Sequence, residues 1–177
     1  FNDRELESYG EANYLKGGIV YSDIVTTVSP TYAYDITTPE GGEGLGGLMY
    51  ARRDSLYGIV NGIDYEEYDP KTDPYLAANF NNVNLVAGKK KNKAALQKEM
   101  GLPVKEDTFL VGIVSRMTDQ KGFDLVAYMM DEMLSTLDIQ FVVLGTGEDR
   151  YQDMFRLFQN KYPDKLCANI GYSEDYA

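Results

Sequence analysis

Histidine is absent from the 177-residue sequence, and cysteine occurs only once, at Cys167. Without histidine the chain lacks the commonest general base and metal ligand, and it cannot form a Ser-His or Cys-His catalytic pair. A single cysteine excludes a disulfide within the chain and a thiolate metal cluster. Since Cys167 lies in the apolar run LCANI, we expect it to be a small buried side chain.

Long apolar runs and an excess of positive charge are also absent. No stretch approaches the roughly 18 to 20 apolar residues of a membrane span, and the opening FNDRELESYG lacks the regions of a signal peptide. The 28 acidic residues exceed the 17 basic ones, for a net charge of −11, which opposes non-specific binding to nucleic acid or an anionic membrane. We therefore expect a soluble protein with neither partner, in which local groups hold any phosphate ligand.

Three short apolar runs in the second half of the sequence are typical of strands in a parallel sheet. They lie at 109–115, 141–145 and 166–171, and we expect the first two to be buried on both faces. Apolar residues at three- and four-residue spacing predict a helix after each of the first two runs. The predicted stripes are Val126, Met129, Met130, Met133 and Leu137, then Tyr151, Met154, Phe155 and Phe158. This alternation predicts an α/β fold with a parallel sheet covered by helices.

The first half of the sequence has weaker signals. Strands are expected at 24–29 and 57–62, and a helix at 85–100. The glycine-rich segment 42–47 is typical of a flexible surface loop. Residues 63–84 are rich in Asp, Asn, Pro and Tyr, which favours a connection between domains over a regular element.

The loops that follow the predicted strands contain the candidate binding residues. Ligands of open parallel sheets bind beyond the carboxyl ends of the strands, so we expect segments 115–122, 145–148 and 171–173 at one edge. Arg116 follows the first strand, and Lys121 lies at the entrance of the next helix. Two cations beside the positive end of a helix dipole form a suitable seat for a diphosphate, where Arg can hold two phosphate oxygens and Lys acts as a point charge.

The same residue types allow a purely structural interpretation. In that alternative, Arg116 and Lys121 are surface residues that pair with Asp119 and Asp124. The residue types alone do not decide between the two.

Two further segments have structural and functional interpretations. The run GTGE at 145–148 lacks the third glycine of a dinucleotide fingerprint, because Arg150 stands at that place. A tight strand-to-helix turn is therefore favoured over close approach of a ligand at Gly145. The lysine run KKKNK at 89–93 lies in the predicted helix with little aromatic interleaving, which favours a solvated helix face over an anion site.

Five segments together resemble one family in their order and spacing. The chain resembles bacterial glycogen synthases and plant starch synthases in the segments NYLKGGIVYSDIVTTVSPTYAYDI (13–36), YGIVNGID (57–64), GIVSRMTDQKGFDLV (112–126), VVLGTGE (142–148) and IGYSE (170–174). This resemblance implies the GT-B fold, in which two Rossmann-like domains face a cleft. It implies transfer of glucose from ADP-glucose to the non-reducing end of an α-1,4-glucan with retention of configuration, without a metal or other cofactor.

The resemblance also implies roles for particular residues. Arg116 and Lys121 match the catalytic basic pair that neutralises the distal phosphate of ADP as glucose leaves. Asn61 matches the cleft residue near the sugar and phosphate, and Tyr172 lies where the family contacts the adenine. Gly145 completes the candidate set for the nucleotide sugar.

The resemblance places the chain within a longer enzyme. Residues 1–62 match the tail of the acceptor-binding domain, and residues 63–177 match the first part of the nucleotide-sugar-binding domain. The family's lysine loop, cleft histidine and paired-glutamate segment have no counterpart here, the chain begins at Phe1, and its last residues, GYSEDYA, are typical of the first turn of a helix. We therefore expect an incomplete GT-B fragment that is inactive alone.

The fragment interpretation implies a location and a mode of association. The family is cytoplasmic in bacteria and plastidic in plants. An incomplete sheet has an uncovered edge, which predisposes the fragment to self-association.

Two alternatives to a glucan synthase remain open. One is a non-catalytic module that binds nucleotide or glucan on the same scaffold. The other is a different retaining GT-B transferase that uses a UDP-sugar or sucrose, because the basic pair does not determine which nucleobase or which acceptor the enzyme binds. The long block that begins at Asn13 favours the glucan synthase.

Overall fold

The computed structural model describes residues 3–8 and 10–173. The chain divides into two compact units, Phe1–Asp64 and Tyr65–Ala177. The predicted boundary after residue 62 lies close to this division, and the functional assignment of the two parts stays a prediction. The helical turn expected at the end of the sequence falls mostly on residues 174–177, outside the described residues. None of the described helices has both the length and the apolar character needed to cross a bilayer.

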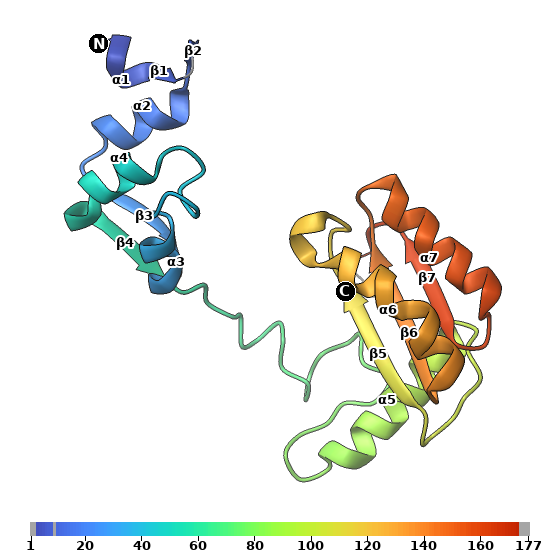
Figure 1. Cartoon of the computed structure of the whole chain (residues 1–177). Coiled ribbons are helices and arrows are strands. Elements are labelled where there is room, and N and C mark those ends of the chain that lie inside the picture. Colours follow the sequence, from blue (N-terminus) through green and yellow to red (C-terminus); the bar gives the residue numbers. More distant parts are fainter. Residues whose placement is uncertain (1–2, 9, 174–177) are drawn as a thin grey trace. The chain divides into compact units, whose positions relative to one another are not determined.

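The first unit is built on short strands and helices (Figure 1). Strands β1 and β2 are antiparallel, whereas β3 and β4 pair in parallel. The parallel pair confirms the strands expected near 24–29 and 57–62. In chain order the elements are α1 (Asp3–Leu6), β1 (Glu7–Ser8), β2 (Glu11–Ala12), α2 (Tyr14–Tyr21), β3 (Val25–Val28), α3 (Pro30–Asp35), α4 (Gly46–Ala51), the short 3-10 helix η1 (Arg53–Ser55) and β4 (Leu56–Ile59).

The glycine-rich segment 42–47, expected to be a flexible surface loop, is exposed in part but closely packed at two of its glycines. A methyl group added at Gly42 would lie 2.3 Å from the Cα of Gly46, and one added at Gly46 would lie 2.3 Å from the carbonyl oxygen of Thr38. Gly46 is also buried and begins α4. Gly42 and Gly46 are therefore explained by lack of space for a side chain, which the sequence pattern did not distinguish from flexibility, whereas a methyl group added at Gly47 would meet nothing within 4 Å.

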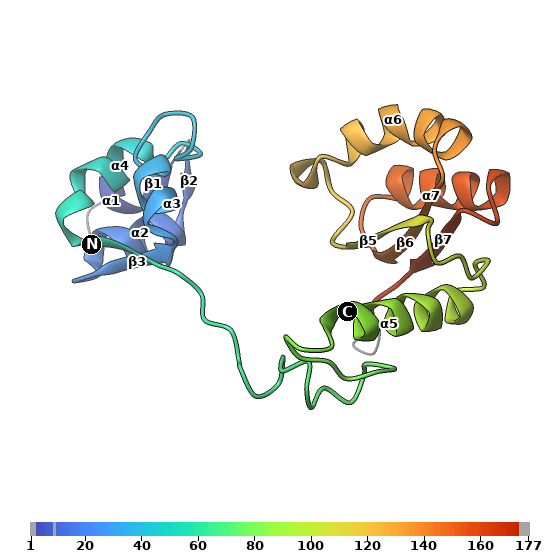
Figure 2. The same ribbon diagram turned by 90° about the horizontal axis from the view of Figure 1, so that it is seen from below.

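The second unit has one three-stranded parallel sheet in the order β5-β6-β7. Figure 2 shows α6 and α7 on one face of this sheet and α5 on the other. This arrangement confirms the predicted α/β architecture and the alternation of strands and helices. The elements are α5 (Leu85–Glu99), β5 (Phe109–Val114), the 3-10 helix η2 (Asp119–Lys121), α6 (Phe123–Thr136), β6 (Ile139–Gly145), α7 (Asp149–Lys161) and β7 (Leu166–Ile170).

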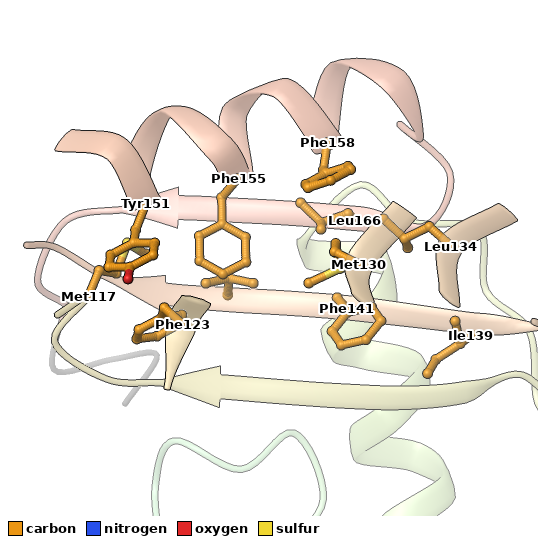
Figure 3. Close-up of a cluster of buried hydrophobic side chains, with 11 residues drawn as sticks. Met117, Phe123, Met130, Leu134, Ile139, Phe141, Tyr151, Phe155, Phe158 and Leu166 are labelled. Carbon is orange, nitrogen blue, oxygen red and sulfur yellow. The ribbon is translucent and has the colours of Figure 1, made fainter. Parts of the chain in front are cut away.

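The core of the second unit lies between the sheet and the two helices α6 and α7. Figure 3 shows aromatic side chains of α7 directed from the helix towards the strands. Phe155 is completely buried, and its ring lies edge-on to that of Phe123 with the centroids 5.7 Å apart. Every residue of β6 from Ile139 to Leu144 is buried, as expected for the middle strand. The buried cluster comprises Met117, Phe123, Met130, Leu134, Ile139, Phe141, Val143, Tyr151, Phe155, Phe158 and Leu166.

Strand β5 was expected to be buried on both faces, and this prediction was wrong. Phe109 is 67% exposed and Val114 is 58% exposed, because β5 lies at the edge of the sheet and only β6 is flanked by strands on both sides. An apolar run does not reveal the position of a strand in the sheet. The exposed edge is compatible with the expected self-association, which stays a prediction.

The predicted apolar stripe of α6 was only partly correct. Met130 is buried as expected, but Met129 and Leu137 are about half exposed. The buried positions of this helix are instead Phe123, Met130 and Leu134, which repeat at seven and four residues on one face.

On the other face of the sheet, the helix expected at 85–100 is confirmed as α5. The lysine run 89–93 was expected to be a solvated face, and Lys89, Lys90 and Lys91 are exposed. Lys93, by contrast, is partly buried and donates to the carbonyl oxygens of Glu106 and Thr108. Cys167 is only partly buried, contrary to expectation, because β7 is also an edge strand. This partial burial raises the pKa of its thiol.

We predict that Phe155→Ala lowers the free energy of unfolding of the second unit by about 3 to 5 kcal/mol, because it leaves a cavity in the core. Hydrogen exchange of the β6 amides measures this unit by itself. The matched control is Leu157→Ala on the same helix, where the side chain is 62% exposed; it should change stability by no more than about 0.5 kcal/mol. Equal effects of the two substitutions would contradict the assigned core.

Candidate functional site

A hollow of about 210 Å³ lies at the carboxyl ends of β5, β6 and β7. Its wall comes from the three loops that the sequence placed at one edge of the sheet. It is lined by Val114, Ser115, Arg116, Leu144, Gly145, Thr146, Gly171, Tyr172 and Ser173. The structure therefore brings together three of the predicted site residues, Arg116, Gly145 and Tyr172.

Arg116 is the cation of this hollow. It follows β5 directly and is exposed. It forms no ion pair with any residue in the described part of the chain. The alternative in which Arg116 and Lys121 pair with Asp119 and Asp124 was wrong. Among the described residues no ion pair joins either cation to either carboxylate, and the carboxylate of Asp119 is engaged by Arg150 and by the hydroxyl of Tyr151.

The other two predicted site residues do not line the hollow. Lys121 is exposed and ends the short helix η2, one residue before Gly122. Gly122 has φ 72° and caps α6 at its amino end, so Lys121 lies beside the positive end of that helix dipole. Asn61 follows β4 and belongs to the first unit, so its predicted role stays a prediction.

The turn at GTGE is shaped by close contact between two loops. A methyl group added at Gly145 would lie 1.9 Å from the carbonyl oxygen of Ser115, and one at Gly147 would lie 2.3 Å from that of Met117. Met117 and Gly147 also form a parallel bridge beyond the ends of the strands. These contacts support the tight turn that the sequence favoured. They explain the glycines without a ligand, and they leave open whether a ligand approaches Gly145.

A cluster of charged groups that the sequence did not predict joins the same two loops. Arg150 pairs with the carboxylates of Asp119 and Glu148, and the distance from its Nη2 to Glu148 Oε2 is 2.7 Å. The backbone N–H of Asp119 donates to Glu148 Oε1 at 3.2 Å. The phenol of Tyr151, a residue that is 4% exposed, donates to Asp119. The one sequence signal was Arg150 itself, which replaces the third glycine of the fingerprint.

These contacts shift two pKa values in opposite directions. The hydrogen bond from Tyr151, followed by that from Arg150, lowers the pKa of Asp119 below its usual 3.8. The same bond to Asp119, together with burial, raises the pKa of Tyr151 to about 12. Asp119 is therefore a carboxylate and Tyr151 a neutral donor across the physiological range.

The arrangement can bind an anion at the sheet edge. One guanidinium lines the hollow, and a lysine and a helix amino end lie on the following turn. Such groups suit a diphosphate. Among the described residues, no group of three or more His, Cys, Asp or Glu side chains is arranged to hold a metal ion.

We predict that Gly147→Ala destabilises the second unit by about 1 to 3 kcal/mol, because the added methyl group meets backbone atoms that cannot move independently. Hydrogen exchange at the amides of Met117 and Glu148 should report the local opening. Gly112→Ala is the matched control, since a methyl group there meets nothing within 4 Å. Similar losses for both variants would contradict the close contact at Gly147.

We also predict a pH-dependent effect of Asp119→Asn. Because the folded state lowers the pKa of Asp119 below 3.8, its contribution to stability is present above that value. The contribution is lost as the pH falls through the lowered pKa. Unfolding of both forms at pH 6 and at pH 2 should therefore show a less stable variant at pH 6 and a smaller difference at pH 2. A difference independent of pH would refute this assignment.

Comparison with known proteins supports the family resemblance. The family model for the starch synthase catalytic domain matches residues 1–51. The chain is 59% identical over 175 residues to a glycogen synthase of Lachnospira eligens, and the match covers 99% of this chain and 36% of that protein. It is 52% identical over 172 residues to a glycogen synthase of Thermotoga maritima, covering 97% of this chain and 35% of the relative.

A solved structure supports the same relationship in three dimensions. It is the catalytic domain of starch synthase IV from Arabidopsis thaliana bound to ADP and acarbose. The two share 38% sequence identity with a TM-score of 0.86, over 97% of this chain and 35% of that one. The chain thus spans about a third of the length of the proteins it matches. Across almost all of its residues the chain is 49–59% identical to curated glycogen synthases, and it is thus similar to about one third of a bacterial glycogen synthase in sequence and of a plant starch synthase in structure.

Proposed function

We propose that the second unit binds the nucleotide part of ADP-glucose, as part of a retaining glucosyltransferase that extends an α-1,4-glucan at its non-reducing end. The observation that supports this most strongly is the hollow at the carboxyl ends of β5, β6 and β7. It is lined by a guanidinium, a close-packed glycine turn and an exposed tyrosine, namely Arg116, Gly145 and Tyr172.

The chemistry proposed for this hollow is electrostatic. As glucose leaves, negative charge develops on the distal phosphate of ADP, and a fixed cation stabilises that charge more in the transition state than in the ground state. We assign this role to Arg116 and, from the next turn of the chain, to Lys121. Each charged hydrogen bond contributes roughly 1.5 to 3 kcal/mol. In this proposal side chains supply the positive charge, and no metal is required.

The remaining assignments rest on family likeness. Tyr172 is 81% exposed at the rim of the hollow, a position suited to stacking on a purine. Asn61 is proposed to contact the sugar and phosphate from the first unit. The related starch synthase IV structure contains ADP and acarbose, which supports a nucleotide and an oligosaccharide as the two ligands. The bacterial relatives favour the cytoplasm over a plastid as the compartment.

We predict that Arg116→Ala weakens binding of ADP to the 177-residue chain by roughly tenfold to a hundredfold, because it removes one charged contact to phosphate. Isothermal titration with ADP and with UDP measures the affinity and the choice of base. The matched control is Arg156→Ala, which removes an exposed arginine of α7 that pairs with Asp153 and should leave ADP affinity unchanged. Lys121→Ala then measures the second cation separately.

Two results would oppose this proposal. If Arg116→Ala and Arg156→Ala have the same small effect on ADP binding, Arg116 does not contact the phosphate. Equal affinities for ADP and UDP would favour a transferase that uses another nucleotide sugar.

A further inference from the structure

The loop that carries both candidate cations is hydrogen-bonded to the loop after β6 at every second residue. Ser115, Met117 and Asp119 each form hydrogen bonds to segment 144–148, at N···O distances of 2.8–3.2 Å. These contacts extend the parallel pairing of β5 and β6 beyond the two strands. The path of the backbone through Arg116 is therefore fixed from both sides.

The side chains of this loop separate into two sets. Met117 is fully buried in the core, where Figure 3 shows it beside Tyr151. Its neighbour Arg116 instead lines the hollow. Since Met117 is held in the core while Arg116 next to it lines the hollow, anchoring Met117 keeps Arg116 at the proposed phosphate site.

Asp119 is the last of these hydrogen-bonded residues before Lys121, and a buried tyrosine holds its carboxylate. The hydroxyl of Tyr151 donates to the Asp119 carboxylate, while the ring of Tyr151 packs on that of Phe123 with the centroids 5.6 Å apart. The guanidinium of Arg150 lies over the Tyr151 ring, 4.6 Å from its centroid, and pairs with Asp119 and Glu148. Although Asp119 is itself exposed, its position is thus determined by a residue of the core.

We propose that Tyr151 and Arg150 are positioning residues for the diphosphate of the nucleotide sugar, acting through Asp119 on the loop that carries Arg116 and Lys121. This inference rests on the proposed function. A loop that is already ordered loses less conformational entropy when the ligand binds, and its cations keep the geometry that two phosphate groups require. Tyr151 and Arg150 need not touch the ligand.

Tyr151→Phe tests this role because it removes a single hydroxyl and keeps the aromatic ring in the core. Tyr162→Phe is the matched control, since Tyr162 also donates its hydroxyl to a carboxylate, that of Asp131 at 2.9 Å, outside the site. Each form of the 177-residue chain is titrated with ADP and with AMP. The ratio of the two affinities reports contact with the distal phosphate, which AMP lacks, and a general loss of stability does not alter it.

We expect Tyr151→Phe to reduce the preference for ADP over AMP by about threefold to tenfold, as for loss of a hydrogen bond to a charged group. Tyr162→Phe should leave the preference unchanged. In the Arg116→Ala background, Tyr151→Phe should have little further effect, because it acts through the same loop. Arg150→Ala should reduce the preference as Tyr151→Phe does, and Arg150→Lys should restore it only in part, since lysine cannot hold two carboxylates with a planar fork.

The outcomes separate this inference from the function on which it rests. If the chain without substitutions does not prefer ADP to AMP, the result opposes the proposed function and with it this inference. A preference that depends on Arg116 but survives both Tyr151→Phe and Arg150→Ala would overturn the positioning role alone. Hydrogen exchange of the β6 amides, measured for each variant, establishes that the core remains folded.

Discussion

Strand β6 has a parallel neighbour on each side, and this central position determines where the candidate groups of the second unit lie. Its residues from Ile139 to Leu144 are buried, and β5 and β7 run in the same direction beside it. The loops after the three strands therefore emerge at one edge of the sheet. Because a shift of one residue in register would turn each side chain to the other face, the buried β6 also determines which loop residues face the hollow.

Backbone pairing between the loops after β5 and β6 continues the parallel arrangement past the ends of the strands. Gly145 and Gly147 allow the backbone after β6 to approach the backbone after β5, where any side chain would collide with a carbonyl group. Met117 then anchors the first loop in the core. The glycine turn thus serves the proposed site by setting the path of the neighbouring loop, whether or not a ligand touches the glycines.

The sequence predicted the features that depend on local periodicity and failed on those that depend on tertiary position. The strands of the second unit and the buried positions Tyr151, Phe155 and Phe158 follow from apolar spacing. The exposure of β5 does not, because an apolar run contains no information on strand order. The partner of Asp119 was also missed. Sequence proximity suggested Arg116 or Lys121, whereas the real partners are more than thirty residues further on, in α7. Parallel pairing brings these distant segments together, and it leaves Arg116 on the side of the hollow, away from Asp119.

The acidic residues beside the basic loop raise an electrostatic problem that Arg150 resolves. Asp119 and Glu148 lie at the same edge as Arg116 and Lys121, in a chain whose net charge is −11. If both carboxylates were unpaired, they would offset the two cations and repel a diphosphate. Arg150 pairs with both, and these contacts raise its pKa further above its usual range, so it remains charged at any pH at which the protein is folded. The carboxylates can therefore hold the loop in place while the edge remains attractive to an anion. Because the rest of the chain repels phosphate at long range, binding must depend on charges fixed within a few ångströms of the ligand. A loop held by the core meets that requirement better than a mobile surface lysine would.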